Sequence, residues 1–237
     1  KGSYTDESKQ GECTPCAGGT YQDAEAQKGC KACERGSYCA EGASAPLPCV
    51  AGSYSTATNL TAAGECTDAL PGHFATTGST QQTACAKGSY AATGGLSECE
   101  LCAGGTYQNN TGAPSCLDCE QGSYCEPGAS RPLPCEGGSY SDKTDLSAAS
   151  QCAPADPGYI AARGATEQTA CGEGSFASGT RNAVGQLCAA GPHHGATGAR
   201  ECTAADPRYF ATTASTQQTA CAKGSYTDAY GQGECTL

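Results

Sequence analysis

Residues 13–21 read CTPCAGGTY, and residues 99–107 repeat this run as CELCAGGTY. The aromatic residue that ends each run returns about every 17 positions, and in twelve of fourteen units a glycine stands two residues before it. Tyr159 and Tyr209 lack that glycine, and one unit has a histidine, His193, in place of tyrosine or phenylalanine. Self-similarity at so short a period predicts an array of units that pack on their neighbours, not a single globular core. The series comprises Tyr4, Tyr21, Tyr38, Tyr54, Phe74, Tyr90, Tyr107, Tyr124, Tyr140, Tyr159, Phe176, His193, Tyr209 and Tyr226.

The 237-residue chain has few large apolar residues: Leu, Ile, Val and Phe together account for 16, and Met and Trp are absent. With a net charge of −11, such a composition is typical of disorder, because burial cannot offset an ordering cost of about 1.5 kcal/mol per residue. The 20 cysteines reverse this expectation. A disulfide that closes a loop of about 15 residues contributes roughly 3 kcal/mol. The composition therefore predicts a disulfide scaffold formed outside the reducing cytosol.

The charge balance, 24 acidic against 13 basic side chains, argues against binding to nucleic acid or to anionic membranes. It suits an exposed array that has to remain soluble. No apolar run approaches the roughly 18 residues needed to span a bilayer. Lys1 opens within the repeat pattern without a signal peptide, so we expect any targeting segment to lie outside this sequence.

Longer periods are superimposed on the short one. The eight cysteines from Cys13 to Cys85 recur 86 positions later, from Cys99 to Cys171. A third copy is shortened, and the run that begins at Lys223 matches the run at Lys1 in ten of thirteen positions. We therefore expect four divisions, namely long repeat 1 at 1–86, long repeat 2 at 87–172, a shortened repeat 3 at 173–222 and the start of a further long repeat at 223–237.

Each unit has the sequence features of a short β-hairpin. The glycine allows a turn or a close backbone approach, and the Ser/Thr-Tyr pair that follows favours extended structure. Polar tracts rich in Thr, Ser, Gly and Asn lead to the next cysteine. Apolar residues show no helical periodicity. The expected fold class is a small disulfide-rich repeat, a linear array of short β-hairpin units of about 17 residues with little helix, in which the aromatic residues form a partly buried ladder.

These motifs resemble the ephrin-receptor-like cysteine-rich repeats, which are related to the tumour-necrosis-factor-receptor and growth-factor-receptor cysteine-rich modules. The resemblance rests on the C-x-x-C-x-x-G-T-Y runs from Cys13 to Tyr21 and from Cys99 to Tyr107, and on the G-S-Y-C turns that end at Cys39 and Cys125. It covers nearly the whole chain. It implies a fold type that many unrelated extracellular proteins share, and it does not specify a function.

Two departures from the pattern are visible. Ala69 stands where the first long repeat should have a cysteine, and Pro192-His193 interrupts the G-S-Y motif. We expect these units to be looser or to be held by their neighbours. The section from Cys171 to Tyr209 is accordingly the one candidate for a special surface.

The spacing of the cysteines predicts four disulfides that each enclose thirteen residues and one aromatic unit. These are Cys16–Cys30, Cys85–Cys99, Cys102–Cys116 and Cys221–Cys235. Two further groups are expected to pair among themselves: Cys33, Cys39, Cys49 and Cys66, and likewise Cys119, Cys125, Cys135 and Cys152. Within each group, pairing first with third and second with fourth fits the spacing as well as pairing first with second and third with fourth.

Two thiols remain unmatched by this reasoning. Cys13 should close a loop opened by a cysteine before Lys1, and one of the three cysteines in the shortened copy is left over. We expect the array to continue at both ends and the leftover cysteine to link segments or chains. The candidates for such contacts are Cys13, Cys171, Cys188 and Cys202.

Other chemistries for the cysteines and histidines have less support. The C-x2-C-x13-C-x2-C spacing from Cys13 to Cys33, repeated from Cys99 to Cys119, is also that of a zinc site, but the remaining twelve cysteines lack it. The His193-His194 pair is expected to be polar surface. No calcium-loop or nucleophile signature occurs. The sequence therefore predicts no catalytic residue, no cofactor and no metal site.

Two N-glycosylation sequons lie in the polar tracts, at Asn59-Leu60-Thr61 and at Asn109-Asn110-Thr111. Asn59 and Asn109 are therefore candidate glycan acceptors. A glycan coat would protect an array with little core from proteolysis.

The leading functional hypothesis is an extracellular structural repeat protein that forms part of a glycosylated filament, surface appendage or matrix fibre. Its partners would be further copies of itself or a continuation of the same array, together with covalent glycans. It would reach the extracellular space or the cell surface through the secretory pathway. The alternative is a stalk or ligand-binding ectodomain of a cell-surface receptor or adhesin, which the family resemblance permits. Regularity favours the first hypothesis, because a binding module concentrates unusual residues in one patch.

Overall fold

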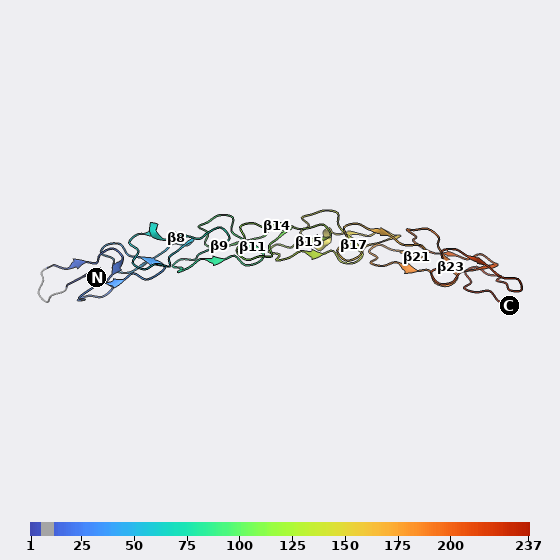
Figure 1. Cartoon of the computed structure of the whole chain (residues 1–237), viewed down its shortest axis with the longest axis horizontal. Coiled ribbons are helices and arrows are strands. Elements are labelled where there is room, and N and C mark those ends of the chain that lie inside the picture. The colour runs from blue at the N-terminus through green and yellow to red at the C-terminus, as the bar shows by residue number, and fades with distance from the viewer. Residues whose placement is uncertain (6–11) are drawn as a thin grey trace. The chain divides into compact units, whose positions relative to one another are not determined.

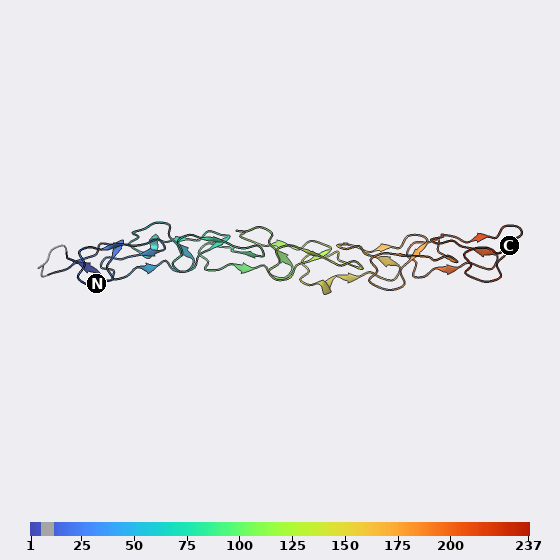
Figure 2. The same cartoon turned by 90° about the horizontal axis from the view of Figure 1, so that it is seen from below.

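The computed structural model describes residues 1–5 and 12–237 in two compact units. Within each unit, short antiparallel hairpins follow one another in chain order (Figure 1), and the turned view gives the same order (Figure 2). The described residues contain no α-helix and only two 3-10 turns, which confirms the expected hairpin array with little helix. Unit 1 comprises Lys1–Ala103, Tyr107–Leu117 and Pro127–Arg131, and unit 2 comprises Gly104–Thr106, Asp118–Glu126 and Pro132–Leu237.

Unit 1 holds six complete hairpins whose strands are two residues long. The pairs are β1 (Ser3–Tyr4) with β2 (Thr14–Pro15), β3 (Thr20–Tyr21) with β4 (Lys31–Ala32), β5 (Ser37–Tyr38) with β6 (Leu47–Pro48), β7 (Ser53–Tyr54) with β8 (Thr67–Asp68), β9 (His73–Phe74) with β10 (Thr83–Ala84), and β11 (Ser89–Tyr90) with β12 (Glu100–Leu101). The strands β13 (Thr106–Tyr107) and β14 (Leu117–Asp118) lie where the two units divide the sequence.

Unit 2 repeats this organisation with six further hairpins. The pairs are β15 (Ser123–Tyr124) with β16 (Leu133–Pro134), β17 (Ser139–Tyr140) with β18 (Ala153–Pro154), β19 (Tyr159–Ile160) with β20 (Thr169–Ala170), β21 (Ser175–Phe176) with β22 (Gln186–Leu187), β23 (Pro192–His193) with β24 (Thr203–Ala204), and β25 (Tyr209–Phe210) with β26 (Thr219–Ala220).

Strands of two residues are stable here because each aromatic strand also contacts the next repeat. In β3, Tyr21 pairs antiparallel with Lys31 and forms a parallel bridge with Ala43. The amide of Gln22 then donates to the carbonyl of Ala43 at 3.1 Å. An isolated two-stranded hairpin is only marginally stable in water. The pairing of each aromatic strand with the following hairpin is therefore what allows such short hairpins to fold.

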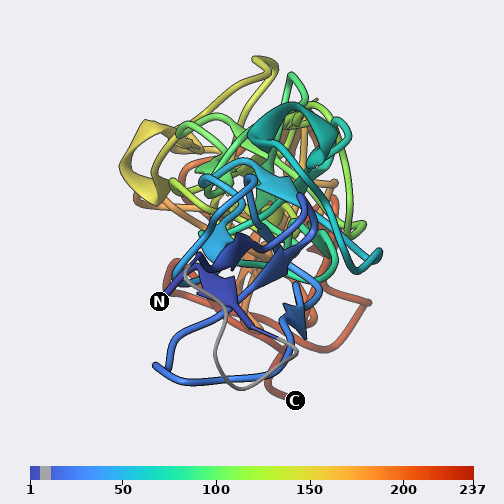
Figure 3. The ribbon, with the colours of Figure 1, turned by 90° about the vertical axis from the view of Figure 1, so that its left-hand side faces the viewer.

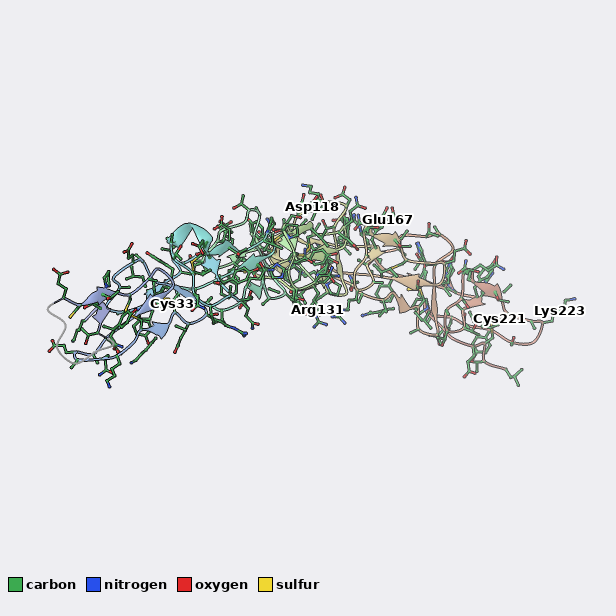
Figure 4. The ribbon with its side chains drawn as sticks, turned by 60° about the vertical axis from the view of Figure 1, so that its left-hand side comes forward. Cys33, Asp118, Arg131, Glu167, Cys221 and Lys223 are labelled. Atoms are coloured by element: carbon green, nitrogen blue, oxygen red, sulfur yellow. A yellow bond between two sulfur atoms is a disulfide. The ribbon has the colours of Figure 1, made fainter. Side chains whose placement is uncertain are left out.

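Cysteines and alanines form the interior in place of large apolar residues. Cys33 and Cys85 expose no surface, and Ala91 and Ala155 are equally buried. Figure 4 shows that the acidic side chain of Glu167, by contrast, points outward. The sulfur atoms therefore occupy the space that leucine and phenylalanine fill in a globular core.

The aromatic positions are mostly half-buried. For two of them, however, the expected series named the wrong residue, one position too early in the sequence. The register pairs Ile160 with Thr169, so Ile160 occupies the aromatic position and Tyr159 occupies the neighbouring serine position. Phe210 replaces Tyr209 in the same way. At the serine position Tyr159 and Tyr209 are 37% and 38% exposed, whereas Ile160 and Phe210 are half-buried like the other residues of the series.

Two hairpins carry a longer connection that contains a 3-10 turn, η1 (Ala63–Glu65) and η2 (Ala149–Gln151). The Oε1 atom of Gln151 accepts hydrogen bonds from the amides of Ser147 (2.6 Å) and Ala148 (3.1 Å) at the start of η2. Neither turn buries a residue, and η2 (yellow) lies at the edge of the ribbon in Figure 3. In the part of the chain that the structure describes, no helix has the length and apolarity to cross a membrane.

Candidate functional site

The junction between successive hairpins is the repeated structural site of this chain. At one such junction the amide of Cys33 donates to the carbonyl of Gly19 at the other end of the same hairpin, β3–β4, at 2.9 Å, and the amide of Gly19 donates to the carbonyl of Cys39 in the next hairpin at 2.8 Å. The carbonyl of Cys33 accepts from the amide of Asn59, also at 2.9 Å. Each hairpin is thus hydrogen-bonded to the hairpins before and after it. The same bonds recur at equivalent positions within both units of the structure.

Glycine is favoured at this junction by its conformation and by the space around it. Gly19 has a φ of +84°, in the left-handed region that glycine adopts without steric cost. A Cβ atom on Gly19 would also overlap the carbonyl oxygen of Asn59. Arg208 occupies the equivalent position in a later hairpin with a φ of +75°, and there the glycine is missing.

Among the described residues nine disulfides close the hairpins, and they include the four pairs that the spacing predicts. The two groups of four pair first with second and third with fourth. The long loops are Cys16–Cys30, Cys85–Cys99, Cys102–Cys116, Cys188–Cys202 and Cys221–Cys235; the short loops are Cys33–Cys39 and Cys119–Cys125; the loops that contain η1 and η2 are Cys49–Cys66 and Cys135–Cys152.

Three hairpins replace the short disulfide with a pair of buried alanines. Ala69 and Ala75 are each 1% exposed, at the positions that Cys33 and Cys39 take in an earlier hairpin. The amide of Gly95, in the second hairpin further along the chain, donates to the carbonyl of Ala69 at 2.8 Å, as the amide of Asn59 donates to Cys33 in a cysteine hairpin. The hairpin with Ala69 is therefore held by its neighbours. The other two pairs are Ala155 with Ala161 and Ala205 with Ala211.

A glutamine side chain accompanies each alanine pair. The Oε1 atom of Gln168 accepts from the amide of Asp156 at 2.7 Å, and its Nε2 atom donates to the Asp156 carboxylate at 2.9 Å. Gln82 and Gln218 make the corresponding backbone contact in the other two hairpins. In the disulfide-closed hairpins this position is a proline, Pro46 or Pro132. The pairing of Gln with Ala-Ala and of Pro with Cys-Cys is a sequence signal that the spacing argument missed.

Comparison with known families assigns the middle of the chain. Residues 88–132 match the family described as tyrosine-protein kinase ephrin type A/B receptor-like. The chain carries an ephrin-receptor-like cysteine-rich domain. Together with nine disulfides, this match indicates an extracellular domain. Comparison with curated proteins gives no match.

Two cysteines of the array have no disulfide partner among the described residues. Cys13 is exposed, and Cys171 is fully buried. Burial raises the pKa of the Cys171 thiol above its usual value, which keeps the thiol protonated and unreactive in the folded state. Cys188 and Cys202 bond to each other, so neither provides the link between chains that the sequence suggested. Of Cys171, Cys188 and Cys202, Cys171 is therefore the leftover thiol.

The two sequons lie on the surface of the array. The side chains of Asn59 and Asn109 are exposed, as a glycan acceptor requires. Asn59 has a φ of +63°, and its amide is bonded to Cys33. Next to Asn109, the buried side chain of Gln108 donates to the carbonyl of Ser115 at 2.7 Å and fixes the loop. Both acceptors thus project from backbone that the ladder holds in place.

The remaining polar groups add local contacts. His193 takes the aromatic position opposite Thr203, and the amide of His194 donates to the carbonyl of Ser215. Lys31 forms an ion pair with Asp23 at 2.7 Å, and this hydrogen bond lowers the pKa of Asp23. Among the described residues no three His, Cys, Asp or Glu side chains are grouped as metal ligands would be.

Proposed function

We propose that this ephrin-receptor-like chain is an extracellular structural protein, part of a glycosylated filament, surface appendage or matrix fibre. The observation that carries the proposal is the repetition of one junction along the chain. The cysteines, alanines and glycines that vary least between hairpins are those that close a hairpin or bond it to the next. A chain whose regular positions are all used for closure and stacking is suited to a mechanical role.

The proposed partners are further copies of the chain or further units of the same array. The exposed thiol of Cys13 supports this part of the proposal, because it is accessible to a cysteine of another segment or chain. Glycans at Asn59 and Asn109 are proposed as a protective coat. The location would be the extracellular space or the cell surface.

Electron microscopy of the native assembly tests the structural role. Antibodies raised against the folded, non-reduced chain should label a filament or fibre at regular intervals. The same preparation, treated with an N-glycosidase and analysed by mass spectrometry, should show Asn59 and Asn109 converted to aspartate. Labelling of dispersed cell-surface molecules, with no fibre present, would contradict the filament.

The alternative is a stalk or ligand-binding ectodomain of a receptor or adhesin. The match of residues 88–132 to an ephrin type A/B receptor-like family favours it. Dispersed surface labelling in the microscopy experiment would support this alternative. A specific ligand bound by the isolated chain would decide for a binding ectodomain over a stalk.

A further inference from the structure

One stretch of unit 2 has no disulfide over a much greater length than any other in the described chain. Thirty-five residues, 153 to 187, lie between Cys152, which closes one loop, and Cys188, which opens the next. The corresponding residues of unit 1 are interrupted by the Cys85–Cys99 disulfide. We call residues 153–187 the open stretch.

The first cause of the open stretch is the alanine pair. Ala155 and Ala161 stand where Cys119 and Cys125 form a disulfide in an earlier hairpin, and both alanines are buried. The hairpin keeps its backbone path, since the amide of Ala155 donates to the carbonyl of Gly138 at 2.9 Å. Covalent closure is therefore lost while the fold is kept.

The second cause is a glycine in the place of a cysteine. Gly185 follows Cys171 by the same 14 positions that separate Cys16 from Cys30 and Cys85 from Cys99. A Cβ atom on Gly185 would lie 3.3 Å from the sulfur of Cys171. Across a disulfide this separation is roughly 3 Å, given an S–S bond of about 2.05 Å. The backbone at Cys171 and Gly185 has thus retained the geometry of a disulfide that the sequence no longer allows.

Only non-covalent contacts hold the two hairpins of the open stretch together. The amide of Arg181 donates to the carbonyl of Ala155, and the amide of Ala161 donates to the carbonyl of Asn182, each at 3.0 Å. Arg181 carries a positive φ of +61°, which is unfavourable for a residue other than glycine. The hydrogen bonds between Gln168 and Asp156 are exposed to water. Local opening free energies are lowest where few buried contacts and exposed hydrogen bonds coincide.

We propose that the open stretch is a releasable segment of the array. Under tension its two hairpins separate first, while the disulfide loops on either side stay closed. The released stretch has an extended length on the order of 120 Å, at about 3.3–3.6 Å per residue, and the gain is this length less the distance that the folded stretch spans. Release also uncovers the thiol of Cys171. The biological use of this extra length rests on the proposed mechanical function, but the release itself does not.

Pulling single molecules of the full chain by its ends, without reductant, tests the proposal. The wild-type chain should give a first extension event that corresponds to the open stretch. The variant Gly185→Cys should bond to Cys171 and remove 14 residues from that event, a shortening of roughly 50 Å. The matched variant Cys99→Gly removes the Cys85–Cys99 disulfide and creates an equal stretch, 67–101, in unit 1. It should add a second event of the wild-type size.

A second measurement keeps the proposal testable if Gly185→Cys does not form its disulfide. In the wild-type chain the amides of Ala161 and Arg181 should exchange with deuterium at least tenfold faster than their counterparts Ala75 and Gly95 in unit 1. Equal exchange at these matched positions would overturn the proposal. A first extension event that keeps its length in Gly185→Cys, after mass spectrometry has shown the introduced cysteine bonded to Cys171, would overturn it as well. Failure of the filament proposal would be seen separately, by microscopy.

Discussion

Single glycines determine how closely the hairpins of this array can stack. Gly72 shows both requirements, since its φ is +81° and a Cβ atom would overlap the carbonyl oxygen of Gly112. That carbonyl belongs to the second hairpin further along the chain, so each glycine admits a backbone contact beyond its nearest neighbour. The recurrence of the glycine is therefore a packing requirement and not only a turn signal.

The variant Gly72→Ala should destabilise its hairpin by about 3 kcal/mol. A positive φ costs an alanine about 1 kcal/mol, and a forced backbone shift at a packed site costs about 1–3 kcal/mol more. Hydrogen exchange at the amides of Cys85 and Gly112 measures the effect. Gly64→Ala is the control, because Gly64 has open space around its Cβ position and should change stability by less than about 0.5 kcal/mol. Equal protection in the two variants would show that the contact does not matter.

At the scale of the hairpin, one backbone accommodates several ways of closure. Cys33–Cys39 closes its hairpin covalently, whereas Ala69 and Ala75 fill the same buried positions with methyl groups. Junction hydrogen bonds are common to both kinds of hairpin. The ladder of backbone bonds therefore defines the hairpin, and the disulfide adds stability to a conformation that exists without it.

Joint replacement of Ala69 and Ala75 by cysteine should create a tenth disulfide. The equivalent Cys33 and Cys39 have Cα atoms 6.0 Å apart, within the range that a disulfide needs. We expect a mass loss of about 2 Da on oxidation and a local unfolding free energy that is higher by about 1–3 kcal/mol. The single variant Ala69→Cys is the control and should retain a free thiol. Free thiols at both introduced positions, in addition to those of Cys13 and Cys171, would disprove the equivalence of the two hairpins.

The aromatic ring of each hairpin should act on the following one. Tyr124 packs against a buried cluster of Leu146 with the cysteines Cys135 and Cys152. The variant Tyr124→Ala should cost roughly 2 kcal/mol, less than the loss of a fully buried ring because Tyr124 is only half-buried. Hydrogen exchange should rise in β15–β18 and stay unchanged in β25–β26, since coupling in an array is between neighbours. Tyr226→Ala, at a position that is 56% exposed, should have little effect.

For the whole molecule, stability depends on many local closures and not on one core. The buried residues are almost all cysteine, alanine and small polar side chains. Each disulfide spans at most 17 positions, so every covalent constraint is local. Loss of one closure should therefore affect one part of the chain, and loss of all of them should affect every part.

Complete reduction should unfold the chain at neutral pH and room temperature. The 16 Leu, Ile, Val and Phe residues cannot offset the conformational entropy of 237 residues once the disulfides are gone. Circular dichroism and limited proteolysis, before and after reduction and alkylation, measure the change. Alkylation without reduction reaches the exposed Cys13 only and should leave the structure intact. Retention of protease resistance after reduction would show that the hydrogen-bond ladder suffices.

Repetition by itself determined most of the architecture. The 17-residue period, the position of the glycine before the aromatic residue and the 14-residue spacing of cysteines such as Cys16 and Cys30 could be interpreted directly, because the contacts that they describe are local in sequence. The absence of a conventional core followed from composition alone. Local contacts of this kind leave few alternatives for the chain.

Tertiary structure decided the features that depend on which way a side chain faces. Spacing allowed two pairings for Cys33, Cys39, Cys49 and Cys66. The path of the backbone decides between them, because it brings the first of these cysteines to the second and the third to the fourth. A shift of one residue in the register placed Ile160, not Tyr159, in the ladder. The leftover thiol became identifiable as Cys171 once Gly185 was seen to occupy the position of its partner. Sequence distance limits which residues can meet, but the direction of each side chain is fixed by the fold.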